Sequence, residues 1–94
     1  MPTVVYGDFE WDEAKAKANE AKHGVSFEEG AQAFTDPYSV DFEDADHHDR
    51  LVTVALSPRE RMLCVVTTAR GSRTRIISAR SASTHERRIY EGDP

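Results

Sequence analysis

The sequence predicts a single α+β domain over residues 1–94, in which two N-terminal helices precede an antiparallel sheet of three to five strands and a C-terminal helix follows it. Three observations support this fold class. The chain of 94 residues is long enough for one modest hydrophobic core. Apolar residues recur at helical spacing early in the chain and alternate with polar residues later. Short turn segments separate the alternating runs, which requires antiparallel neighbours.

Two helices are expected before the sheet. Asp12 can cap a first helix over residues 13–23, because its carboxylate can accept a hydrogen bond from the first turn, and Gly24 suits the left-handed residue that follows a helix. The segment Ser-Phe-Glu-Glu that begins at Ser26 has the pattern of a capping box. A second, shorter helix is therefore expected there, and Asp36-Pro37 ends it.

Alternation with a period of two predicts the sheet. Tyr38, Val40 and Phe42 alternate with polar residues, as in a half-buried strand. Further strands are expected over residues 51–56, 61–68 and 73–80, and residues 4–11 are a candidate for one more. Ser83 begins Ser-Thr-His-Glu, a second capping box, which predicts a last helix that stops at Gly92.

The charged residues are distributed unevenly along a chain whose net charge is −5. Residues 1–49 hold all three lysines and thirteen acidic residues, whereas residues 50–90 hold all nine arginines and only two acidic residues. Arginine suits bidentate binding of phosphate, so the second half could bind an anionic partner such as RNA. The alternative is that the two halves neutralise each other when the chain folds.

The sequence shows no sign of membrane insertion or secretion. The longest apolar run, residues 62–66, is far too short to span a bilayer, and residues 1–6 lack the pattern of a signal peptide. Cys64 is the single cysteine, which excludes an intramolecular disulfide. Because it stands in an apolar run, Cys64 is expected to be a buried small hydrophobe rather than a nucleophile. A cytoplasmic location is expected.

Three segments of the chain carry a recognisable set of motifs. The first combines Phe-Glu-Trp-Asp at residues 9–12, Lys15 and Asn19 with Lys-His-Gly-Val-Ser-Phe-Glu-Glu at residues 22–29. The second is Asp36-Pro37 with the strand after it. The third is Arg-Ile-Ile-Ser-Ala-Arg at residues 75–80, with Glu86-Arg87 and Tyr90 downstream. In this order the segments resemble the BrnT family of toxins, and the resemblance covers nearly all of residues 9–91.

The resemblance implies a RelE-like fold and the activity of an endoribonuclease toxin from a type II toxin–antitoxin pair. Such a toxin would cleave RNA without a metal ion or other cofactor and inhibit translation. A ribbon-helix-helix antitoxin similar to BrnA would neutralise it, and the complex would bind operator DNA through the antitoxin. The arginine-rich side is expected to bind RNA in the free toxin and an acidic antitoxin segment in the inhibited one.

Cleavage of RNA through its own 2′-hydroxyl needs one group to remove a proton, one to deliver a proton, and cations to offset the growing negative charge. Lys22 and His23, at the end of the first helix, could bind phosphate and transfer protons. Alternatively, both side chains stabilise the C-terminus of that helix. Arg50, just before a strand, is a further candidate cation. The nuclease hypothesis expects the arginines of the second half to gather beside His23.

Arg75 and Arg80 are the remaining candidate catalytic cations. In a regular strand Arg73 and Arg75 would share one face and Arg80 would lie on the other, so Arg75 and Arg80 could not reach one phosphate. They could do so only if a bulge intervenes or Arg80 lies beyond the strand end; otherwise one of them is structural. Arg75 is favoured as the phosphate ligand, and Arg80 could instead pair with Glu86 or another acid.

Additional RNA contacts are expected from Arg73, Arg87, Arg88 and Tyr90. Tyr90 could stack on a base or pack on the sheet. The stretch Asp44–Asp49 contains His47 and His48, which lack the spacing of a helical zinc site, so a solvated loop without metal is expected. Two other functions stay open: a module of the same fold that binds a protein or nucleic acid without cleaving, and a metal-dependent nuclease.

Overall fold

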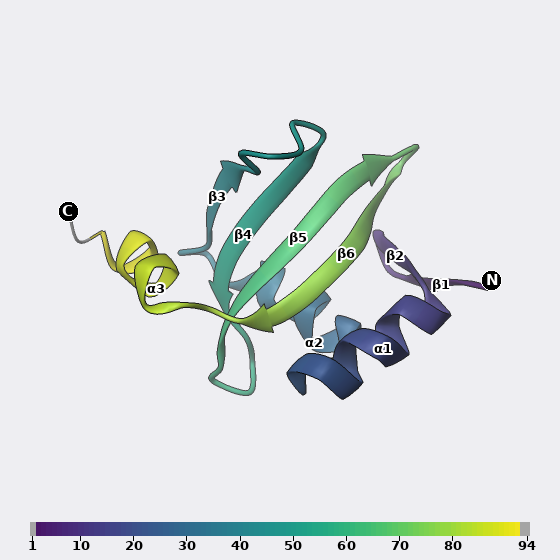
Figure 1. The fold of residues 1–94 in the computed structure, drawn as a ribbon, viewed down its shortest axis with the longest axis horizontal. Helices are drawn as coiled ribbons and strands as arrows, with labels where there is room; N and C mark the ends of the chain where they lie inside the picture. Colours follow the sequence, from purple (N-terminus) through teal and green to yellow (C-terminus); the bar gives the residue numbers. More distant parts are fainter. Residues whose placement is uncertain (1, 93–94) are drawn as a thin grey trace.

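Six strands form one mixed sheet in the computed structural model, which describes residues 2–92 (Figure 1). The strands are β1 (Thr3–Tyr6), β2 (Phe9–Asp12), β3 (Val40–Glu43), β4 (Arg50–Leu56), β5 (Met62–Arg70) and β6 (Arg73–Ser81). Their order across the sheet is β1-β2-β6-β5-β4-β3. The helices are α1 (Glu13–His23), α2 (Phe27–Gln32) and α3 (Thr84–Glu91), with a 3-10 turn η1 (Ala33–Thr35) after α2. None of the helices within residues 2–92 is long and apolar enough to cross a bilayer.

The α+β class is confirmed, but the prediction of an antiparallel sheet with three to five strands is wrong. The structure has six strands, and β2 runs parallel to its neighbour β6. The two N-terminal helices are present, yet they follow a β1–β2 hairpin that turns at Gly7, whose φ is 61°. Each hairpin strand has only four residues, too few to show a clear alternation. The parallel pair joins segments far apart in the chain, and local patterns do not reveal such pairing.

The core lies between the sheet and the helices α1 and α2, which cover one face. Trp11 and Phe27 are both buried, and their rings meet edge to face with centroids 5.8 Å apart. Asn19 fastens α1 to β6, because its side-chain amide donates to the carbonyl of Ala79 at 2.7 Å and accepts from the Ala79 amide at 3.2 Å. A Cβ added at Gly30 of α2 would lie 3.2 Å from the Cβ of Ala79, so glycine permits this close approach.

A bulge in β6 decides which way its side chains point. The pairing with β5 leaves Ile77 without a partner residue, so the alternation of faces shifts by one at that position. Ile76 and Ala79 therefore both face the core, with exposed fractions of 2% and 0%. Their neighbours Arg75 and Arg80 both face the opposite side of the sheet, which a regular strand would not allow.

The last helix, α3, lies beyond the end of β6 and is held mainly by polar contacts (Figure 1). Its first turn is closed by a capping box between Ser83 and Glu86, as the sequence predicts. Glu86 also binds Arg80 of β6, and the hydroxyl of Tyr90 donates to Asp36 at 2.7 Å. Neither α3 nor α1 has a fully buried residue, whereas α2 has four. Polar contacts rather than buried side chains therefore hold α3 in place.

Candidate nucleic-acid interface

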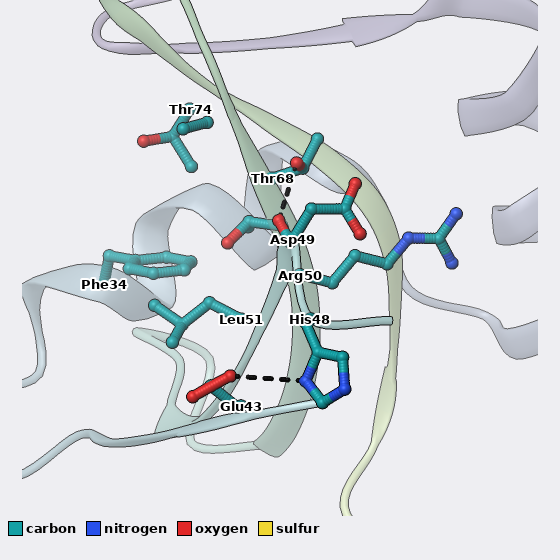
Figure 2. A pocket seen from close by; sticks show the side chains of 10 residues that line it. Phe34, Glu43, His48, Asp49, Arg50, Leu51, Thr68 and Thr74 are labelled. Atoms are coloured by element: carbon teal, nitrogen blue, oxygen red, sulfur yellow. Dashed lines mark hydrogen bonds and ion pairs between the residues drawn. The ribbon is translucent and has the colours of Figure 1, made fainter. Parts of the chain in front are cut away.

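Four arginines gather on the face of the sheet that α1 and α2 leave uncovered. Arg50 of β4 pairs with Thr68 of β5, Thr68 pairs with Arg75 of β6, and Arg75 pairs with Glu10 of β2. Directly paired residues point to the same face, so the side chains of Arg50, Thr68, Arg75 and Glu10 form one row across the sheet. Neighbouring strands are ~4.8 Å apart, which places the Cα atoms of Arg50 and Arg75 about 10 Å from each other. Figure 2 shows Arg50 extending away from Phe34, which lies on the helix side.

Glu10 organises this row together with the adjoining β5–β6 turn. Its carboxylate is only 8% exposed and accepts a 2.6 Å hydrogen bond from Arg75. The guanidinium of Arg70 lies 3.7 Å from the same oxygen, and Arg73 faces Arg70 across the turn. We call Arg50, Arg70, Arg73 and Arg75 with Glu10 the arginine cluster. Two of the four guanidinium groups, those of Arg70 and Arg75, lie against the one carboxylate, so the cluster carries an excess of positive charge.

The arginines of the cluster differ in how firmly they are held. The side chain of Arg75 is 16% exposed and is fixed by the charge-assisted bond to Glu10. Within residues 2–92, Arg50 and Arg73 have no ion-pair partner. Their positive charges are therefore available to an anionic ligand, while Arg75 presents a guanidinium in a set position.

Arg80 faces the same side of the sheet as the cluster but is occupied by α3. Its two terminal nitrogens each lie 2.8 Å from a carboxylate oxygen of Glu86, in a bidentate pair. These hydrogen bonds lower the pKa of Glu86 to about 2, against the opposing effect of burial. Cys64 lies beneath the pair, fully buried, and burial raises the pKa of its thiol to about 12. Cys64 is therefore a buried thiol, as the sequence predicts.

Lys22 and His23 are not brought together with the arginine cluster. Both lie in the last turn of α1, and that helix packs on the other face of the sheet through Asn19 and Ala79. The expectation that the arginines gather beside His23 therefore does not hold in this structure. A lysine and a histidine in this turn suit the negative end of the helix dipole.

The other predicted RNA contacts are divided between the two ends of β6. Arg73 lies at its start, in the cluster, whereas Arg87 and Arg88 are exposed on α3, which follows its end. Tyr90 is partly buried, and its hydroxyl is taken by Asp36. This hydrogen bond raises the pKa of Tyr90. Of these four residues, only Arg73 adjoins the row of Arg50 and Arg75.

Several arginines of the second half do pair with acids of the first half. Besides the pairs made by Glu10, the buried Glu29 of α2 accepts hydrogen bonds from Arg61 and Ser57 of the β4–β5 hairpin. The guanidinium of Arg59 lies 3.6 Å from the same carboxylate. The hydrogen bonds from Arg61 and Ser57 lower the pKa of Glu29. The acidic first half and the arginine-rich second half of the chain therefore neutralise each other's charge only in part.

Sequence reasoning missed Glu10, Thr68 and Arg70 as members of the candidate site. A signal for Glu10 was present, because it stands between two apolar aromatic residues, Phe9 and Trp11. Once residues 9–12 are assigned to a strand, Glu10 must face away from the core that holds Trp11. Thr68 and Arg70 had no comparable signal, since their roles follow from the register between β4, β5 and β6.

The acidic loop between β3 and β4 shows only loose contacts. His47 lies 3.9 Å from a carboxylate oxygen of Asp44, and His48 lies 3.6 Å from one of Glu43. Across residues 2–92, no group of three His, Cys, Asp or Glu side chains is arranged to hold a metal ion.

Comparisons with known proteins agree on one family. The family described as "Ribonuclease toxin, BrnT, of type II toxin-antitoxin system" matches residues 11–86. The crystal structure of the ribonuclease toxin BrnT from Brucella abortus is 30% identical in sequence and superposes with a TM-score of 0.64, covering 79% of this chain and 94% of that one. A search of curated proteins gave no significant match. Since the family match spans most of the chain and a solved member shares its fold, the chain belongs to the BrnT family of ribonuclease toxins.

Proposed function

We propose that this chain is an endoribonuclease that holds the scissile phosphate of RNA on the arginine cluster and cleaves through the neighbouring 2′-hydroxyl without a metal ion. The row Arg50–Thr68–Arg75 carries this proposal. Thr68 is short, so the two longer arginine side chains stand on either side of it. Guanidinium groups on both sides of a short residue suit a phosphate, which accepts paired hydrogen bonds from each of them.

The cluster can also assist the chemistry. Negative charge grows on the phosphate as the 2′-hydroxyl attacks, and a guanidinium held in place by Glu10 stabilises that charge without first having to reorganise. Glu10 is the one carboxylate of the cluster. Its Oε2 contacts Arg75 and Arg70, whereas its Oε1 has no hydrogen-bond or ion-pair partner among residues 2–92. Oε1 is therefore the candidate acceptor for the 2′-hydroxyl proton. As the 2′-oxygen bonds to phosphorus, the P–O5′ bond breaks, and the leaving 5′-oxygen takes its proton from water.

The other predicted site residues take different roles in this proposal. Arg80 positions α3 through Glu86 and is not a phosphate ligand while that pair is closed. Lys22 and His23 stabilise the end of α1 on the far side of the sheet. Arg87 and Arg88 extend the path of the RNA beyond the cluster, because they are exposed on α3.

The proposal includes the partners of such a toxin. Cleavage of mRNA would inhibit translation and arrest growth. A ribbon-helix-helix antitoxin, similar to BrnA, would neutralise the toxin by placing an acidic segment on the arginine cluster, and the complex would bind operator DNA through the antitoxin. The positive charge of the cluster supports competition between an acidic segment and RNA for one surface.

The test uses purified toxin, freed of its antitoxin, and a labelled RNA of mixed sequence. Arg50→Ala is expected to lower the cleavage rate about 100-fold, since it removes one of the two guanidinium groups proposed to hold the phosphate. Arg59→Ala is the matched control, because Arg59 is exposed and lies in the β4–β5 hairpin, outside the cluster. Cleavage is expected to persist in EDTA and in His23→Ala. Equal rates for Arg50→Ala and the control would refute the proposed site.

One observation favours a second function, a module that binds without cleaving. The cluster contains no histidine, and His23 lies on the opposite side of the sheet. In that case the purified chain would bind RNA or its partner but leave the RNA intact, and growth arrest would survive Glu10→Gln. Loss of cleavage in EDTA, restored by a divalent cation, would instead indicate a metal-dependent nuclease.

A further inference from the structure

A cavity of about 340 Å³ opens on the helix side of the sheet, next to η1 (Figure 2). Phe34 forms one wall and Leu51 another, while Thr67, Ala69 and Thr74 contribute from the two central strands. This volume lies near the lower end of the range for small-molecule sites, which is ~300–1,000 Å³. It therefore suits one flat ring system rather than a peptide helix.

The walls of the cavity fit the faces of an aromatic base. Phe34 is fixed by Phe9, whose ring centroid is 5.0 Å away, so it offers a rigid aromatic surface. Ala69 and Thr74 face each other directly on neighbouring strands, and both are small, which leaves the space beside Phe34 open. Apolar and aromatic walls of this kind hold unstacked RNA bases in other recognition sites.

The negative charge at the rim of the cavity favours a base over a phosphate as the ligand. Glu43 is among the lining residues, and a carboxylate at the rim repels a phosphate. Asp49 also lines the cavity, but Figure 2 shows its carboxylate on the side of Arg50. His48 lies 3.6 Å from Glu43, and Figure 2 shows this pair beside Leu51. His48 Nδ1 faces Glu43 Oε1, so the pair offers a base the carboxylate of Glu43 as an acceptor, with His48 orienting it. Guanine alone among the four bases has two adjacent N–H donors on its Watson–Crick edge, and one carboxylate can accept from both.

The cavity adjoins the arginine cluster. Arg50 and Thr68, which belong to the row proposed to hold the phosphate, are also among the residues that line the cavity. Leu51, next to Arg50 in the chain, points to the cavity side of the sheet while Arg50 points to the cluster side. One nucleotide can thus pass over this end of the sheet, with its base on one side and its phosphate on the other.

From these observations we propose that the cavity is a subsite for a guanine base next to the scissile phosphate, with Glu43, oriented by His48, reading its Watson–Crick edge. The inference rests on the proposed function, because it supposes that RNA reaches the cluster. It makes the enzyme selective for guanine at one position beside the cleaved bond.

The first experiment needs no cleavage. The purified chain is titrated with guanosine, adenosine, cytidine and uridine, and amide NMR shifts of Thr67, Ala69 and Thr74 report on the cavity. Guanosine is expected to bind at least about tenfold more tightly than the other three, and Glu43→Gln is expected to remove that preference.

Glu20→Gln is the matched control, because Glu20 is exposed on α1. Ala69→Leu, which fills the cavity at an exposed position, should abolish binding. Equal binding of all four nucleosides, or none, overturns the inference, as does unchanged guanosine binding in Ala69→Leu.

The second experiment separates this inference from the proposed function. The ends produced from a mixed-sequence RNA are mapped for the unchanged chain and for Glu43→Gln. A guanine preference that falls about tenfold in Glu43→Gln supports the subsite. An unchanged preference overturns the subsite while leaving the arginine cluster intact as the cleavage site. Selective guanosine binding by a chain that cleaves no RNA would support the subsite and refute the nuclease proposal.

Discussion

Arg50 and Arg75 lie on the same row of the sheet, two strands apart, with Thr68 directly between them. This relationship depends on the register of β4, β5 and β6, which the bulge at Ile77 shifts by one residue between Ser78 and Ile76. The remainder of the row is Glu10, which fixes Arg75. The arrangement gives one cation that is rigid and one that is free to meet a ligand.

Replacing Glu10 by glutamine tests whether that carboxylate accepts a proton during cleavage. The side chain keeps its shape, but it loses its negative charge and its basicity, so single-turnover cleavage of saturating RNA should fall about 100-fold. RNA affinity should stay the same or rise, because the cluster becomes more positive. Single-turnover rates and equilibrium binding measured side by side check both parts. Glu20→Gln serves as control, and a loss confined to affinity would contradict the assignment.

The salt dependence of RNA binding should reveal how many arginines contact phosphate. Arg73 is exposed and has no ion-pair partner among residues 2–92, so Arg73→Ala removes one contact without leaving a buried acid unpaired. The slope of log K against log salt concentration should become less steep by about 0.7 for single-stranded RNA. Titrations at several salt concentrations measure it. A slope identical to that of the unchanged chain would exclude Arg73 from the RNA path.

Stability should depend on Glu29, which lies far from the arginine cluster. It is 3% exposed and joins α2 to the β4–β5 hairpin through Arg61 and Ser57. Glu29→Ala removes a buried, hydrogen-bonded charge and should lower the free energy of unfolding by about 3 kcal/mol. Urea denaturation measures this loss, with the exposed Glu28→Ala as control. A change below about 1 kcal/mol would mean that solvent replaces these contacts at little cost.

The local elements of this fold could be predicted from the sequence, and the long-range ones could not. The caps at Asp12, Ser26 and Ser83 lie where their motifs predict, because capping is a contact over three residues. The β2–β6 pairing and the bulge at Ile77 depend on segments far apart in the chain.

The candidate site shows the same division. Regular alternation predicts that Arg75 and Arg80 lie on opposite faces of the sheet unless a bulge separates them. The structure contains such a bulge, and both side chains lie on one face. The choice of Glu86 as the partner of Arg80 was open in the sequence and is resolved by geometry. The position of His23 relative to the arginines required knowledge of which face α1 covers, which no local pattern provides.

The attachment of α3 should weaken in acid. The pKa of Glu86 falls from 4.5 in the unfolded chain to about 2 in the folded one, so its pairing with Arg80 stabilises the fold above pH 4.5. That contribution is lost as the pH falls through about 2 and amounts to about 2 kcal/mol once solvent screening at Arg80 is included. Unfolding free energies between pH 5 and 2 should fall less steeply in Arg80→Met than in the unchanged chain. If the free energy of unfolding fell equally steeply with pH in both chains, other carboxylates, such as Glu29, would account for the whole loss of stability in acid.

The reactivity of Cys64 should report whether α3 opens. The thiol is fully buried under α3, and its pKa of about 12 keeps it protonated at pH 8, so a thiol reagent should label the native chain slowly. Tyr90→Phe removes the hydroxyl that donates to Asp36, one of the polar contacts that hold α3. If that contact contributes about 1 kcal/mol, local opening and labelling should accelerate about fivefold. Tyr38→Phe, at a side chain that is 76% exposed, is the control. Equal labelling rates in the two variants would mean that Cys64 is reached only by global unfolding, and that α3 does not open on its own.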